Sequence, residues 1–68
     1  MDFITALKIV LEGGRVCRSS WDDLKAYVSV NSSMLTIRKE DKFHSWMISR
    51  DDMEAEDWEI WQAGRAVS

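Results

Sequence analysis

The sequence predicts an α+β domain in which an N-terminal helix packs on an antiparallel sheet of four or five short strands, with a short helix before the last strand. Three observations lead to this fold class. Apolar residues repeat at helical spacing near the N-terminus, apolar and polar residues alternate through the middle of the chain, and a helix-capping sequence interrupts the alternation near residue 49. Separate helical and strand periods within one short chain are typical of α+β architecture.

The first predicted helix covers residues 2–12. Asp2 can cap its first turn. Gly13 and Gly14 predict a left-handed helix end, because glycine adopts positive φ without strain. One apolar stripe repeats at i, i+4, i+7 and i+8, and its members are Phe3, Leu7, Val10 and Leu11.

Strands follow the glycines, each marked by alternation of apolar and polar residues. Polar residues 31–33 and 40–42 supply turns, so the later strands are expected to form antiparallel hairpins. In the last of these strands, His44, Trp46 and Ile48 share one face. The predicted strands cover residues 15–21, 26–30, 34–39 and 43–49.

The second predicted helix begins after Ser49, which forms a capping-box-like pair with Asp52. Carboxylates in its first turn suit the helix dipole, and the other acidic residues keep the helix solvated. Alternation returns at residue 57 in a last strand, with Trp58 in the core and Trp61 exposed or at an interface. The domain is therefore expected to cover residues 1–61, with 62–68 as a frayed tail.

A chain of 68 residues buries only about 60% of its unfolded surface, so its core needs support. Cys17 is the single cysteine, which excludes an internal disulfide, and with one histidine no zinc site is expected. Oligomerisation is the remaining route. Apolar residues make up 46% of the chain and include four tryptophans, which favours a homo-oligomer.

The charge balance and the N-terminus limit the partners and the location that we expect for the protein. Nine basic and 12 acidic residues give a net charge of −3, which argues against binding nucleic acid polymers through their phosphates. The N-terminus lacks the pattern of a signal peptide, and no apolar run is long enough to cross a membrane. A cytoplasmic protein is expected.

No arrangement in the sequence predicts catalysis. The only histidine lies within a predicted strand without a nucleophile in its sequence context, and phosphate-binding loops and metalloprotease motifs are absent. The acidic run at residues 51–59 does not fit a calcium loop. Neither an enzyme nor a metal or cofactor is expected.

The stretch RSSW at residues 18–21 offers a different chemistry. Trp21 lies at a turn, three residues after Arg18, with hydroxyl groups between them. An indole beside an arginine can stack on a base while the cation binds phosphate. A lid on the core is an equally good interpretation of Trp21.

Two motifs resemble a family of small phage proteins that includes the second type of Thoeris anti-defence protein, over residues 3–61. The opening F-x-x-A-L-x-x-L-x-x-G-x-x-V-x-R-x-x-W is carried by Phe3, Ala6, Leu7, Val10, Gly13, Val16, Arg18 and Trp21. The end W-x-x-S-x-x-D-M-x-A-x-D-W is carried by Trp46, Ser49, Asp52, Met53, Ala55, Asp57 and Trp58.

The resemblance implies a sponge that sequesters a cyclic ADP-ribose isomer or a cyclic dinucleotide in the host cytoplasm without cleaving it. It also implies a homo-oligomer, typically a tetramer, with pockets between protomers. Trp21 would stack on the base, and Arg18 would be a phosphate or structural partner. Ser49 and Asp52 would contact ribose hydroxyls or, as the favoured role, cap the short helix. The ligand-binding residues predicted in this way are Trp21, Arg18, Trp46, Ser49, Asp52 and His44.

A second hypothesis is an acidic inhibitor that imitates nucleic acid and occupies a basic groove on a host defence protein of CRISPR or nucleic-acid-binding type. The carboxylates of residues 51–59 would carry it. A weak phosphodiesterase is a third possibility, without catalytic residues to support it.

Overall fold

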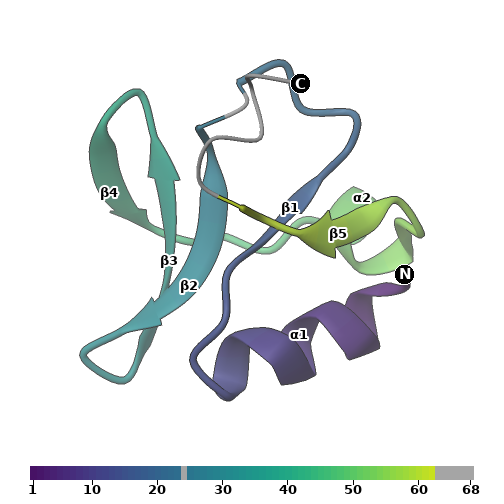
Figure 1. Ribbon diagram of the computed structural model, residues 1–68, viewed down its shortest axis with the longest axis horizontal. Coiled ribbons are helices and arrows are strands. Elements are labelled where there is room, and N and C mark those ends of the chain that lie inside the picture. The colour runs from purple at the N-terminus through teal and green to yellow at the C-terminus, as the bar shows by residue number, and fades with distance from the viewer. Residues whose placement is uncertain (24, 63–68) are drawn as a thin grey trace.

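The computed structural model describes residues 1–23 and 25–62 and confirms the α+β fold class (Figure 1). A five-stranded antiparallel sheet has the order β4-β3-β2-β1-β5, so the last strand pairs with the first. The predicted tail lies outside the described residues, except for Gln62. The elements are α1 (Phe3–Leu11), β1 (Val16–Arg18), β2 (Tyr27–Asn31), β3 (Met34–Lys39), β4 (Lys42–Ser45), α2 (Arg50–Glu54) and β5 (Trp58–Ile60).

Both predicted ends of α1 are confirmed. The Asp2 side chain accepts a hydrogen bond from the Thr5 amide at 2.9 Å. Gly13 has φ of 98°, and the amides of Gly13 and Gly14 bond back to the last helical turn at 2.9 and 2.8 Å. The stripe is shifted from the prediction, because Leu11 is 65% exposed. The buried face is centred on Phe3, Ala6 and Val10.

Two strands are shorter than predicted. β1 ends at Arg18, because the next two residues bond to Asp57: the Ser19 amide donates to its carbonyl at 3.0 Å and the Ser20 amide to its side chain at 3.1 Å. β4 ends at Ser45, so the predicted strand over 43–49 is wrong beyond that residue. The Trp46 amide makes one more bond to β3, and the chain then leaves the sheet to enter α2.

Tight turns set the register of the β2-β3-β4 meander. Ser32 and Ser33 have φ of 53° and 66°, and Glu40 and Asp41 have φ of 55° and 64°. Two consecutive positive φ values match a type I′ turn, whose twist suits the flanking strands. The β2-β3 turn thereby pairs Asn31 with Met34.

The core lies between α1 and one face of the sheet. Trp58 is 2% exposed, which confirms its predicted place in the core, and the Phe3 ring lies 6.1 Å from it. On the opposite face, Trp61 is half-buried with its ring 4.6 Å from that of Tyr27, so it is not simply exposed. The other members of the core cluster are Ala6, Val10, Val16 and Val28.

Candidate ligand-binding site

Two half-buried indoles flank the buried ring of Trp58. Trp21, in the loop after β1, meets Trp58 edge-on at 5.7 Å, and Trp46, after β4, meets it at 5.8 Å. T-shaped pairs of this kind are favoured by the ring quadrupoles. Each flanking indole therefore packs on the core through Trp58 and has an outer surface that remains partly exposed.

A cavity of about 560 Å³ lies against these outer surfaces, on the same face of the sheet as the core. Pockets of 300–1,000 Å³ suit small-molecule ligands. Four of the predicted site residues line it, namely Trp21, His44, Trp46 and Asp52. The remaining lining residues are Asp22, Asp23, Ala26, Ile37, Lys39, Ser45 and Met47.

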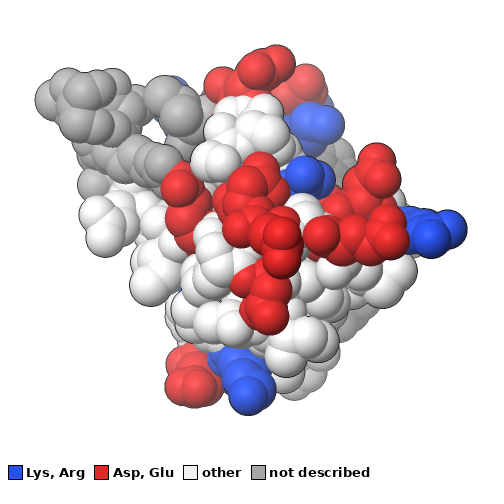
Figure 2. Space-filling model, turned by 90° about the vertical axis from the view of Figure 1, so that its right-hand side faces the viewer, with Lys and Arg blue, Asp and Glu red and all other residues white. Residues whose placement is uncertain are grey.

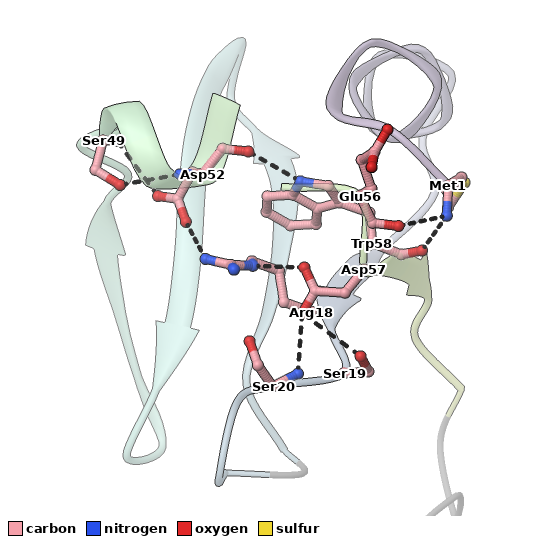
Figure 3. A network of polar contacts seen from close by, with 9 residues as sticks. All are labelled: Met1, Arg18, Ser19, Ser20, Ser49, Asp52, Glu56, Asp57 and Trp58. Carbon is pink, nitrogen blue, oxygen red and sulfur yellow. Dashed lines mark hydrogen bonds and ion pairs between the residues drawn. The ribbon is translucent and has the colours of Figure 1, made fainter. Parts of the chain in front are cut away.

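Arg18 does not line the cavity but joins three segments of the chain (Figure 3). Its Nε donates to Asp57 Oδ1 at 2.9 Å, and its Nη1 donates to Asp52 Oδ1 at 3.2 Å. These bonds hold β1 to α2 and to the residue that precedes β5. Of the two roles expected for Arg18, the structural one accounts for these contacts.

The network also shifts the pKa values of Asp57 and Arg18. Partial burial favours the neutral form of Asp57, but hydrogen bonds from Arg18 and Ser20 outweigh it and lower the pKa of Asp57 to about 2. The same hydrogen bond to Asp57 raises the pKa of Arg18 above its usual value. Both groups are therefore charged at neutral pH.

The predicted capping box of α2 is confirmed, and it fixes Asp52 in the pocket wall. The Asp52 amide donates to Ser49 Oγ at 3.2 Å, and the Ser49 amide donates to Asp52 Oδ2 at 3.3 Å. The Trp58 Nε1 donates to the Asp52 carbonyl at 3.0 Å. Ser49 therefore acts on the pocket through Asp52, since it does not line the cavity itself.

Three charged residues of the pocket, Asp22, Asp23 and Lys39, are not among the site residues that the sequence predicts. Asp22 and Asp23 directly follow Trp21, so their position beside a predicted stacking residue was a usable signal. Lys39 ends β3, and only the pairing of β3 with β4 brings it to the same cavity as His44.

The described residues include no group of three or more His, Cys, Asp or Glu side chains that could hold a metal ion. Neither helix of the described chain has the length and apolar character needed to cross a membrane. What the pocket does contain is aromatic surface with charges of both signs. That combination suits noncovalent binding of a planar, polar ligand.

Comparison with known proteins shows which family the chain belongs to. The family model described as the Thoeris anti-defense 2-like domain matches residues 1–61, which is nearly all of the described chain. No curated protein matches the sequence. The matched range includes both indoles of the pocket and the Arg18 network behind it. The chain therefore belongs to the Thoeris anti-defense 2-like family, whose role is to counter the Thoeris defence of the phage host.

Proposed function

We propose that this phage protein binds a cyclic signalling nucleotide in the pocket and sequesters it in the host cytoplasm without cleaving it. The ligand would be a cyclic ADP-ribose isomer or a cyclic dinucleotide, and its removal would block the immune signal. One observation carries the proposal: Trp21 and Trp46 present partly exposed indoles to a cavity of about 560 Å³ in a member of an anti-defence family.

The indoles supply the binding energy in this mechanism. Stacking a base on an aromatic side chain contributes about 1–3 kcal/mol. Because both rings pack against Trp58, little side-chain entropy is lost when a base stacks on them. A sponge needs no catalytic group, so preorganised binding is sufficient for its function.

Isothermal titration calorimetry against cyclic ADP-ribose isomers and cyclic dinucleotides tests the proposal. Wild-type protein should bind at least one of them, and Trp21→Ala should weaken that binding at least tenfold. Trp61→Ala is the matched control, because its indole lies on the opposite face of the sheet and does not line the pocket. Far-UV circular dichroism establishes that each variant folds.

The absence of heat with every nucleotide at micromolar protein would refute the proposal. Recovery of the ligand is a second readout: a sponge releases it chemically intact after denaturation, whereas a hydrolase releases products. Mass spectrometry of the released ligand separates these outcomes.

A homo-oligomer, expected to be a tetramer, is part of the same proposal. Large apolar side chains remain exposed in the single chain, among them Leu11 at 65% and Met47 at 86%. Met47 lines the pocket, so a neighbouring chain that covers it would also close the cavity to water. Native mass spectrometry should detect the assembly, and a monomer that binds ligand with full affinity would contradict this part.

A protein-binding inhibitor is the second candidate, favoured by the distribution of charge. Figure 2 shows carboxylates spread across the face of the molecule on which α2 lies. Asp51, Glu54 and Glu56 are exposed there. Replacing these three with serine should abolish anti-defence activity if this face binds a basic groove, and leave it unchanged if the pocket is the active feature.

A further inference from the structure

The walls of the pocket carry opposite charges on different segments of the chain. The Lys39 ammonium group and the His44 imidazole belong to the β3-β4 hairpin, whereas the carboxylates of Asp22 and Asp23 belong to the loop between β1 and β2. No ion pair within 4.0 Å joins the two groups among residues 1–23 and 25–62. The cavity therefore separates a cationic wall from an acidic one.

These four side chains make few bonds to the protein around them. The side chains of Asp22, Lys39 and His44 make no hydrogen bond or ion pair with another described residue. The Asp23 side chain accepts a bond from the backbone amide of Lys25, at 2.9 Å, and makes no ion pair with a described residue. All four remain available to a ligand.

Asp52 provides the contrast within the same pocket. Its Oδ1 accepts from Arg18 at 3.2 Å and its Oδ2 accepts from the Ser49 amide at 3.3 Å. Both carboxylate oxygens are therefore engaged in holding the wall together, and the nearby Arg18 charge offsets their own. Asp52 therefore stabilises the pocket wall. The side chains of Lys39, His44, Asp22 and Asp23 have hydrogen-bonding capacity left for a ligand.

We propose that Lys39 and His44 recognise the phosphate of the nucleotide, while Asp22 and Asp23 recognise its ribose hydroxyls. This inference rests on the proposed function and names the specificity-determining residues of that site. An ammonium group donates charge-assisted hydrogen bonds to phosphate oxygens, whereas a carboxylate accepts from hydroxyl groups and repels phosphate. The two walls thus fix the direction in which a nucleotide lies across the indoles, and they select a ribonucleotide over its deoxy counterpart.

Lysine variants test the cationic wall. Titrations would use cyclic ADP-ribose and 3′,5′-cyclic di-AMP, each beside its 2′-deoxy counterpart. Lys39→Gln should weaken binding of the ribonucleotide about tenfold and reduce its salt dependence. Lys42→Gln is the matched control, because Lys42 is the cross-strand neighbour of Lys39 but does not line the pocket. Equal effects of the two variants would overturn the assignment of the phosphate.

Aspartate variants test the acidic wall through a double-mutant cycle. In the wild type, loss of the 2′-hydroxyl should weaken binding about tenfold, whereas Asp22→Ala combined with Asp23→Ala, which removes the acceptors, should bind both forms equally. The cycle is needed because removing these carboxylates also relieves repulsion of phosphate. Glu40→Gln, an exposed residue outside the pocket, controls for net charge.

The outcomes separate this inference from the function on which it rests. A wild type that binds neither the ribonucleotides nor their deoxy forms would overturn both. Binding that requires Trp21 but is indifferent to Lys39 and to the 2′-hydroxyl would retain the sponge and overturn only the division of the two walls.

Discussion

Asp57 is a single side chain on which the loop after β1 and the approach to β5 both depend. It accepts from Arg18 Nε at 2.9 Å and from the Ser20 amide at 3.1 Å, and its own carbonyl accepts from the Ser19 amide at 3.0 Å. The loop that these bonds hold presents Trp21 to the pocket. A residue that does not line the cavity thus determines where one of its indoles lies.

Asp57→Asn should lower the free energy of unfolding at pH 7 and remove part of its acid dependence. The lowering of the Asp57 pKa from 3.8 to about 2 corresponds to about 2 kcal/mol, and partial exposure of 28% reduces this to about 1–2 kcal/mol. Because the folded-state pKa is the lower one, this stabilisation is present above about pH 4 and is lost as the pH falls toward 2.

Urea unfolding between pH 7 and pH 2 measures the effect. Glu56→Gln is the matched control, since it removes a neighbouring exposed carboxylate that has no such bonds. If the two variants gave the same dependence of unfolding free energy on pH, the Arg18–Asp57 pair would not be the source of the effect.

At the scale of elements, the two hairpin turns place unfavourable residues in left-handed conformations. Ser32 and Ser33 both have positive φ, as do Glu40 and Asp41, although none of them is glycine. Positive φ is costly for residues with a Cβ atom. The two turns lie at the two ends of β3, so the β2-β3-β4 meander forms because strand pairing outweighs the local backbone preference at both turns.

Ser33→Gly should stabilise the protein by about 0.5–1 kcal/mol, because glycine adopts its φ of 66° without strain. Ser29→Gly is the matched control: the same substitution within β2, where glycine only adds unfolded-state freedom, should destabilise by a similar amount. Thermal unfolding of the two variants provides the comparison. A loss of stability in Ser33→Gly would show that the serine side chain contributes more than its backbone conformation costs.

At the scale of the whole molecule, one indole joins the core to the site. Trp58 contacts the rings of Phe3, Trp21 and Trp46, and its Nε1 bonds to the Asp52 carbonyl of α2 at 3.0 Å. It is thus the common support of α1, α2 and both indoles of the pocket. In so small a core, a change at this position alters both the stability of the fold and the placement of the two pocket indoles.

Trp58→Ala should unfold the protein, because a large-to-small core change costs about 3–5 kcal/mol, comparable with the whole stability of a domain this small. Trp58→Phe retains an aromatic ring and loses the bond to Asp52, so it should fold with stability reduced by about 1–3 kcal/mol. Far-UV circular dichroism with urea titration distinguishes these results. A folded Trp58→Ala chain of near-wild-type stability would contradict the central place of this indole.

Local signals were sufficient for the features that neighbouring residues control. Both helix ends of α1 and the capping box of α2 were predicted because each depends on residues within one or two turns. The alternation of the chain gave the hairpins and placed Trp58 in the core. The alternation did not predict where β1 and β4 end. β1 ends where the following residues bond to the distant Asp57, and β4 ends where the chain leaves the sheet to enter α2.

The sequence by itself determined the element order, the capped helices and the two indoles that the structure places at the pocket. Only the tertiary structure decided that Arg18 is tied to two carboxylates and that Lys39 and Asp22 line one cavity with those indoles. The reason is physical: caps and periods arise from interactions between near neighbours in the chain. Which charged residues from distant parts of the chain lie close together depends on sheet pairing and packing, and a local sequence pattern does not predict it.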